Sequence, residues 1–212
     1  YKVFGGMSFD QRKEVKDFIA YMRLAINRKD NEAFKRIINY PKRAIGDSTV
    51  DKFIEYAAEN NISLWDASIE VPLPNRAAQA LATFKLQITE MYQYSLNADA
   101  YETAQYIYKL SGLSTELKSD MTNEGISRLE NVMALLDGVK EFTEQDDVDE
   151  ESSTDRSLSS YLQSISLVTE LDQQEGTPEY ITLMSTHSAK GLEFDLVFIG
   201  GLEENLFPSY MA

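Results

Sequence analysis

Two short apolar runs near the C-terminus, separated by an eight-residue connector, constrain the fold of this 212-residue chain more than any other feature. The runs cover residues 180–185 (Tyr-Ile-Thr-Leu-Met-Ser) and 194–199 (Phe-Asp-Leu-Val-Phe-Ile), and a glycine follows the second run. Short apolar, β-favouring runs with glycine at their ends are typical of buried strands. The sequence therefore predicts two core strands joined by residues 186–193.

The connector holds a hydroxyl, an imidazole, an ammonium group and a carboxylate, together with a glycine. Such a concentration of polar groups is typical of a loop at which a rigid sheet presents binding or reactive side chains. The alternative is a tight turn whose polar side chains are only solvated. Residue spacing alone does not separate these two interpretations.

The connector and the residues after it resemble a motif of a known enzyme family. Residues 186–194 read Thr-His-Ser-Ala-Lys-Gly-Leu-Glu-Phe, and residues 203–208 read Glu-Glu-Asn-Leu-Phe-Pro. Together they resemble motif V of the UvrD/PcrA/Rep group of superfamily 1 DNA helicases. Residues 5–17 resemble the segment that opens the accessory-domain insertion in the same family, and the two segments follow the family's order.

This resemblance implies a mainly α fold made of two domains. Residues 1–28 and 177–212 would form part of a RecA-like α/β motor domain, called 2A, to which both chain ends contribute. Residues 29–176 would form a helical accessory domain, called 2B, inserted into 2A. The chain begins in what reads as the middle of a strand and without an initiator Met, so we expect it to be a piece of a longer protein.

The resemblance also implies roles for single residues. Glu193 matches the residue that hydrogen-bonds the ribose of ATP, and Gly191 would keep the backbone close to the nucleotide cleft. His187 and Arg12 match residues that contact single-stranded DNA, and an imidazole can donate to a phosphate or stack on a base. Lys190 has two open roles, which are a contact on the DNA side and a cap for the connector.

The net charge of −15 is unevenly distributed along the chain. Residues 1–52 hold 12 Lys and Arg against 7 Asp and Glu, whereas the remaining 160 residues hold 8 against 28. Phosphate binding needs cations, but exposed charges more than about 8–10 Å apart are largely screened. An acidic protein can therefore bind DNA through a local basic patch, and we expect such a patch in the first quarter of the chain.

A basic stretch in this quarter resembles the helix-hairpin-helix element that holds duplex DNA without reading its bases. Residues 41–49 read Pro-Lys-Arg-Ala-Ile-Gly-Asp-Ser-Thr and lie between two predicted helices, about residues 31–39 and 48–60. A glycine in such a hairpin lets the backbone approach a phosphate. The free N–H groups in the first turn of the next helix can then receive the phosphate oxygens.

Within this first hairpin, defined as residues 41–46, we predict DNA contacts at Lys42, Arg43, Ile45 and Gly46. The two cations would lie beside the phosphate. The hairpin departs from the family's usual Gly-Ile-Gly because it has Ala44 in the first position, which weakens the expectation of a close phosphate contact there. The alternative is an ordinary corner between two helices with a serine, residue 48, as the N-cap.

Apolar residues at helical spacing predict most of the remaining structure. The expected helices cover about residues 9–26, 76–94, 98–110, 126–142 and 158–171, with an apolar segment at 64–71 and a second hairpin-like joint at 111–115. Tyrosines in the 98–110 helix could form a base-stacking platform, but the local lack of Lys and Arg favours packing in the core. Residues 141–155 hold eight acidic and no basic residues, so we expect a solvated loop rather than a metal site.

The chain contains no cysteine, which excludes disulfides and thiolate metal sites and fits a reducing cytosol. No apolar run approaches the roughly 18 residues of a membrane span, and the N-terminus lacks a signal-peptide pattern. We therefore expect a cytoplasmic protein with no membrane partner.

The resemblance implies part of an ATP-dependent 3′–5′ DNA helicase or translocase that acts in DNA repair, recombination or replication. Its partners would be single-stranded/duplex junction DNA, motor domain 1A of the same full-length chain, and repair or replication proteins. Its cofactors would be ATP and Mg²⁺ in the full-length protein. These 212 residues include no G-x-x-x-x-G-K-[ST] phosphate loop, so we expect that alone they neither hydrolyse ATP nor unwind DNA.

Three alternatives remain at this point. The chain could be a non-catalytic DNA-binding module, for which the basic hairpin would suffice. It could be a protein-interaction regulatory module, which its acidic remainder favours. It could also be the motor part of a helicase-nuclease subunit.

Overall fold

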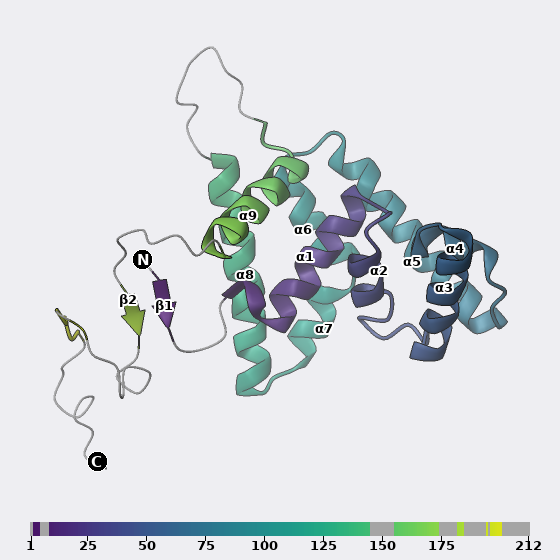
Figure 1. The fold of residues 1–212 in the computed structure, drawn as a ribbon, viewed down its shortest axis with the longest axis horizontal. Helices are drawn as coiled ribbons and strands as arrows, with labels where there is room; N and C mark the ends of the chain where they lie inside the picture. Colours follow the sequence, from purple (N-terminus) through teal and green to yellow (C-terminus); the bar gives the residue numbers. More distant parts are fainter. Residues whose placement is uncertain are drawn as a thin grey trace. The chain divides into compact units, whose positions relative to one another are not determined.

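The structure is a computed structural model that describes residues 2–4, 9–144, 155–173, 182–184, 194 and 196–200. The chain divides into two compact units, one formed by Tyr1–Ser8 with Thr177–Ala212 and one formed by Phe9–Gly176. The larger unit is helical, and the smaller one holds the described strands (Figure 1).

Helices account for the larger unit, so the prediction of a mainly α fold is confirmed. A 3-10 turn, η1 (Phe9–Gln11), is followed by α1 (Lys13–Ile26), α2 (Asn31–Ile37), α3 (Asp47–Asn60), α4 (Leu64–Glu70), α5 (Asn75–Ser95), α6 (Ala100–Leu110), α7 (Leu113–Ser119), α8 (Asn123–Glu144) and α9 (Leu158–Gln173). Within the described residues, no helix combines the length and the apolar character needed to cross a bilayer.

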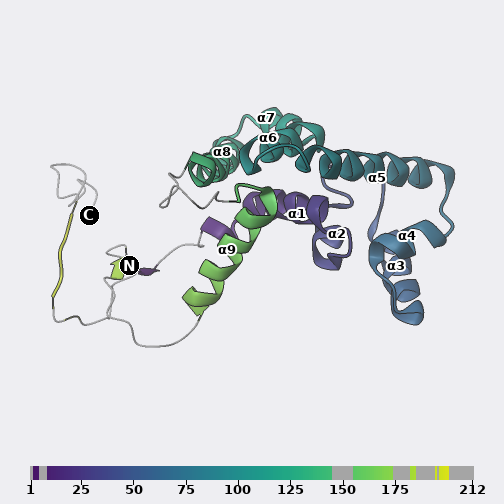
Figure 2. The same ribbon diagram turned by 90° about the horizontal axis from the view of Figure 1, so that it is seen from above.

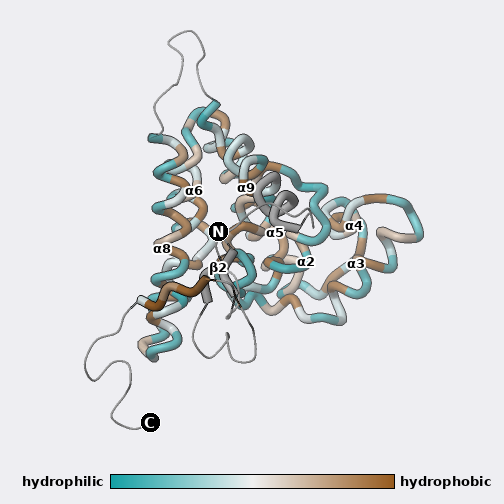
Figure 3. Tube along the Cα trace, turned by 60° about the vertical axis from the view of Figure 1, so that its left-hand side comes forward, coloured by the Kyte–Doolittle hydropathy of each residue, from teal (hydrophilic) through white to brown (hydrophobic). Residues whose placement is uncertain are grey.

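Helix α1 holds this unit together, since it packs against α2, α5, α6, α8 and α9. Val15, Phe18 and Met22 follow one another at helical spacing and are fully buried. Figure 2 shows the long helix α5 running from the α3–α4 end of the unit to the α6–α8 end. Hydrophobic and hydrophilic positions alternate along the helices, as expected for helices with one face in the core (Figure 3).

An aromatic cluster joins the first hairpin's two helices to the rest of the core. The ring of Phe34 on α2 lies 6.3 Å from Phe53 on α3, 6.4 Å from Trp65 on α4 and 6.1 Å from Phe84 on α5. All three pairs meet edge to face, the arrangement that the aromatic quadrupole favours. The cluster fixes the orientation of α2 relative to α3, and therefore the geometry of the hairpin between them.

The two ends of the chain share a sheet in the smaller unit. Strand β1 (Lys2–Phe4) pairs in parallel with β2 (Thr182–Met184), with Val3 opposite Leu183 (Figure 1). A parallel pair needs a long crossover connection, and here the whole helical unit is that connection.

The boundary between the two compact units falls between residues 8 and 9, whereas the predicted domain boundary lies between residues 28 and 29. The difference arises because α1 buries its apolar face against other helices of the larger unit. The assignment of these parts to domains 2A and 2B stays a prediction.

The second predicted strand is wrong in its described part, because Phe194 and residues 196–200 form no regular secondary structure. Leu196 is 74% exposed and Phe198 is 88% exposed. A β-favouring run becomes a strand only when a neighbouring strand pairs with it, and no described strand pairs with this run. The first predicted strand is present as β2.

Three helix predictions also need correction. Helix α1 begins at Lys13 with Arg12 as its N-cap residue, later than the predicted start at about residue 9. The apolar segment at 64–71 forms the helix α4. The hydroxyl of Ser63 caps this helix by accepting from the backbone N of Asp66 at 3.1 Å. The second hairpin-like joint is shorter than predicted, because α7 starts at Leu113.

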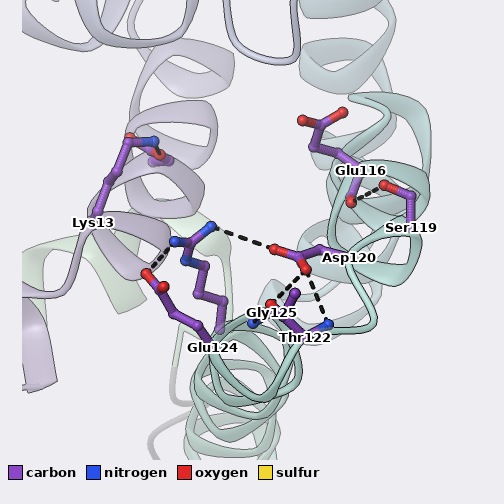
Figure 4. Close-up of polar contacts among 9 residues, drawn as sticks. Lys13, Glu116, Ser119, Asp120, Thr122, Glu124 and Gly125 are labelled. Atoms are coloured by element: carbon purple, nitrogen blue, oxygen red, sulfur yellow. Dashed lines mark hydrogen bonds and ion pairs between the residues drawn. The ribbon is translucent and has the colours of Figure 1, made fainter.

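A tight polar joint links α7 to α8 (Figure 4). The Asp120 carboxylate accepts from the backbone N (3.1 Å) and the hydroxyl (2.6 Å) of Thr122, and that hydroxyl accepts from the backbone N of Gly125 at 3.0 Å. A Cβ at residue 125 would lie 2.3 Å from Cγ of Asp120. The joint therefore requires glycine at this position.

Candidate nucleic-acid interface

The first hairpin is anchored in the core by one apolar side chain. Ile45 is fully buried, so its side chain cannot reach DNA, and any contact from this residue would come from its backbone. The amide oxygen of Asn39 accepts from the backbone N of Arg43 at 2.8 Å and from that of Ile45 at 3.3 Å. One asparagine thus shapes the hairpin, a role that the sequence analysis missed.

Ala44 has a φ of 60°, in the left-handed region that favours glycine. An alanine at this point costs about 1 kcal/mol of backbone strain. Glycine would adopt this conformation without that strain.

Gly46 has no structural need to be glycine. It is exposed, its φ of −82° suits any residue, and a Cβ added to it would meet no atom within 4 Å. It is the N-cap residue of α3, which begins at Asp47, so the interpretation of Ser48 as the N-cap is wrong. No side chain caps this helix, which leaves first-turn N–H groups available to an outside acceptor.

The two cations of the hairpin differ in their surroundings. Lys42 is exposed. Arg43 instead donates from Nη1 to the carbonyl oxygens of Ile37 and Pro41, both at 3.0 Å. Its Nη2 donates to the carbonyl oxygen of Ser111 at 3.2 Å and to the hydroxyl of Tyr21. Lys42 is therefore available to a phosphate, whereas Arg43 is engaged within the protein.

Arg12 lies at the start of α1 and is half-buried. Its Nη1 donates to the side-chain oxygen of Asn131 on α8, and its guanidinium carbon lies 5.5 Å from the centre of the Phe9 ring. The amide nitrogen of Asn131 donates to Glu14 at 2.6 Å. The residue predicted to contact single-stranded DNA therefore also links α1 to α8.

Much of the positive charge in the first quarter of the chain is paired with carboxylates of the same fold. Asp17 is buried and accepts from Lys13 and Arg36, both at 2.7 Å. Further along α1, Nη2 of Arg23 lies 2.7 Å from Oδ2 of Asp30. A count of charges along the sequence cannot reveal this pairing, so the basic patch available to DNA is smaller than the local net charge suggests.

The described part of the helical unit contains a groove and a smaller hollow. A groove of about 1200 Å³ lies among α1, α2 and α9, with Lys16 and Arg23 in its lining. A smaller hollow of about 550 Å³ lies between α5 and α6, where the rings of Tyr94 and Tyr106 stack 4.1 Å apart beside Glu90. A carboxylate at this point disfavours nucleic acid. The tyrosines of α6 were expected to pack in the core, and Tyr108 is the one that is buried.

The predicted motif V contacts lie outside the described residues. This applies to His187, Lys190, Gly191 and Glu193. Strand β2 ends at Met184, and the connector that carries these four residues comes after it in the chain. The described structure therefore fixes the strand before the connector and does not test the roles of the four residues.

A comparison with known proteins identifies the family. A family model described as UvrD-like helicase C-terminal domain matches residues 1–212. The chain is 37% identical over 215 residues to the ATP-dependent DNA helicase PcrA of Staphylococcus aureus (strain Mu50 / ATCC 700699). It is 38% identical over 215 residues to the protein of the same name from Staphylococcus epidermidis (strain ATCC 12228 / FDA PCI 1200).

Each alignment covers 100% of this chain and 29% of the relative, so the chain spans less than a third of the length of these relatives. The family model and both relatives nevertheless match it from its first residue to its last. This chain belongs to the UvrD-like helicase C-terminal domain family.

Proposed function

We propose that this chain is part of an ATP-dependent DNA helicase or translocase that moves 3′ to 5′ along single-stranded DNA. The parallel pairing of β1 with β2 carries this proposal, because it brings both chain ends into one sheet. In open parallel sheets, ligands bind beyond the carboxyl ends of the strands. The connector at residues 186–193 follows that end of β2, which is where a nucleotide cleft would lie.

On this proposal the connector serves two ligands. Glu193 accepts from the ribose hydroxyls of ATP and Gly191 keeps the backbone near the nucleotide. His187, Lys190 and Arg12 contact the single strand. The phosphates and Mg²⁺ of the nucleotide are held by motor domain 1A of the same full-length protein, because these 212 residues contain no phosphate loop.

The first hairpin holds the duplex ahead of the motor. Lys42 is exposed, the first turn of α3 is uncapped, and open space surrounds Gly46. A phosphate can therefore approach the backbone of residues 45–46, where the helix dipole favours an anion. Asp47 in the same turn reduces the attraction, so we expect a weak contact without base specificity.

The proposal is tested on the intact protein with duplexes that carry a single-stranded tail. We expect ATP- and Mg²⁺-dependent unwinding of a duplex with a 3′ tail and little unwinding of one with a 5′ tail. A Glu193→Ala variant should lower the ATP affinity, whereas Glu130→Ala, at an exposed position on α8, should not. Equal unwinding of both substrates, or unwinding without ATP, would refute the proposal.

A further inference from the structure

The guanidinium group of Arg43 has almost no hydrogen-bonding capacity left for a ligand. An arginine has five N–H donors, of which four belong to its two Nη atoms. These two atoms have four acceptors in the protein, namely the carbonyl oxygens of Ile37, Pro41 and Ser111 and the hydroxyl of Tyr21. A phosphate could bind Nη1 or Nη2 only by displacing one of them.

Aromatic rings cover the guanidinium as well. Its central carbon lies 5.0 Å from the centre of the Phe84 ring and 5.8 Å from that of Tyr21. Both rings are buried. Arginine is well suited to such a place, because its flat cation stacks on rings while its edge donates hydrogen bonds.

The acceptors of Arg43 come from three separate parts of the chain. Ile37 and Pro41 precede the arginine at the end of α2 and in the first hairpin, and Tyr21 lies on α1. Ser111 belongs to the joint between α6 and α7, which we call the second joint (residues 111–112). The neighbouring Gly112 has a φ of 84°, and a Cβ on it would lie 3.7 Å from Cγ of Pro41. The first hairpin and the second joint are therefore in contact at the positions that Arg43 connects.

Tyr21 completes the connection from the α1 side. It is only 1% exposed, and its hydroxyl donates to the carbonyl oxygen of Tyr40 at 2.5 Å while accepting from Arg43. Because Tyr21 is buried, it cannot touch DNA. Any effect of this side chain on DNA binding must therefore pass through the hairpin.

From this geometry we infer that Arg43 is a positioning residue, which clamps the first hairpin to α1 and to the second joint and does not itself bind the DNA phosphate. This inference rests on the proposed DNA contact of the hairpin and reassigns the role that the sequence suggested for Arg43. The clamp holds Lys42 and the start of α3 in one fixed arrangement. The hairpin and the second joint consequently behave as one rigid platform.

The test compares two buried tyrosines in the intact protein. Tyr21→Phe removes the hydroxyl that the clamp uses. Tyr108→Phe is its matched control, because the hydroxyl of Tyr108 is buried without a hydrogen-bond partner. The readouts are amide hydrogen exchange of residues 39–46 and binding to a duplex with a 3′ tail, both at a temperature at which all variants are fully folded. Arg43→Lys, which keeps the charge and loses the planar fork, is measured beside them.

We expect Tyr21→Phe and Arg43→Lys to speed exchange across the hairpin and to weaken DNA binding about three- to tenfold. We expect Tyr108→Phe to change neither. A phosphate contact made directly by Arg43 predicts a different pattern, in which Arg43→Lys binds nearly normally and Tyr21→Phe has no effect. That pattern would overturn the inference.

The proposed DNA contact can fail separately. If Lys42→Ala and Gly46→Ser leave DNA binding unchanged, the hairpin is not the duplex contact. The exchange of residues 39–46 in the Tyr21→Phe and Arg43→Lys variants still decides whether the clamp exists. Unchanged exchange in both variants would refute it.

Discussion

Oδ1 of Asp17 on α1 lies 2.7 Å from Nε of Arg36 on α2, and Asp17 is only 3% exposed. The second carboxylate oxygen accepts from Lys13 at 2.7 Å. Arg36 also donates to the carbonyl oxygen of Lys13 at 3.3 Å. This buried carboxylate therefore attaches α2, and with it the start of the first hairpin, to the central helix.

Asp17→Asn tests this connection. The substitution keeps the shape but leaves two cations without their counter-ion, so we expect a loss of about 2 kcal/mol in the free energy of unfolding. Denaturant unfolding measures it. Glu32→Gln is the control, because the Glu32 carboxylate of the Glu32–Lys35 pair is 78% exposed, and it should change stability by less than about 0.5 kcal/mol. Equal effects of the two substitutions would contradict this role of Asp17.

Ala44→Gly should stabilise the protein. Ala44 has a φ of 60°, which glycine adopts without strain, and this gain exceeds the extra freedom that glycine has in the unfolded chain. We expect a net gain of about 0.5–1 kcal/mol in thermal or denaturant unfolding. The same substitution at Ala58, an exposed position inside α3, should cost about 1 kcal/mol. A destabilising Ala44→Gly would show that residue 44 does not hold the left-handed conformation.

Two glycines on α8 should respond in opposite directions to alanine. A Cβ on Gly125 would lie 2.4 Å from the backbone oxygen of Asp120, so Gly125→Ala should cost about 2–3 kcal/mol (Figure 4). A Cβ on Gly138 would meet no atom within 4 Å, so Gly138→Ala should stabilise the helix by about 0.5–1 kcal/mol. Thermal unfolding of the two variants measures both effects. A tolerated Gly125→Ala would mean that the α7–α8 joint is looser than its hydrogen bonds indicate.

Lys85 should make stability depend on alkaline pH. Burial lowers the pKa of Lys85 from 10.5 to about 8, and its ammonium group donates to the carbonyl oxygen of Trp65 at 2.9 Å. Between these two values the unfolded chain binds more protons than the folded one, so the free energy of unfolding rises with pH. The cost of burying the charge is present below pH 8 and is relieved above it.

Unfolding measured from about pH 7.5 to about pH 9.5 checks this direction. Above that range the trend should reverse, because burial raises the pKa of Tyr21 and of Tyr161 to about 12. From about pH 10 upward these tyrosines ionise in the unfolded chain before they ionise in the folded one, so the free energy of unfolding falls as the pH rises. Lys85→Met should flatten the rise, whereas Lys109→Met, at an exposed position on α6, should not. If the free energy of unfolding still rises with pH in Lys85→Met, another group causes the rise.

Local patterns predicted most of the helices and the hairpin because their causes are local. The spacing of Val15, Phe18 and Met22 marks one face of α1, and the structure buries all three. The resemblance marked residue 44 as a position that usually holds glycine, and the φ of 60° at Ala44 agrees with that. The helix α4 was missed because it is a short apolar segment, for which periodicity does not separate helix from strand.

The strand prediction that failed depended on a partner far away in the chain. The run at residues 194–199 has the composition of a strand, but a strand also needs a neighbour to pair with. Arg36 and Arg43 contribute to the positive charge of the first quarter of the chain, but both side chains also have acceptors inside the fold. Such pairing depends on residues as distant as Ser111, which no local pattern reveals.

The salt dependence of DNA binding tests the central claim most directly, that the first hairpin of this chain receives the phosphates of the duplex. Binding to a duplex with a 3′ tail is measured over a range of salt concentrations for the native protein, Lys42→Ala, Gly46→Ser and the exposed control Lys109→Ala. We expect Lys42→Ala to lower the slope of log K against log salt by about 1 and to weaken all sequences alike. Gly46→Ser should weaken binding without unfolding the protein, because serine is a good N-cap residue but blocks close approach of a phosphate. Slopes and affinities equal to those of the Lys109→Ala control would contradict the account.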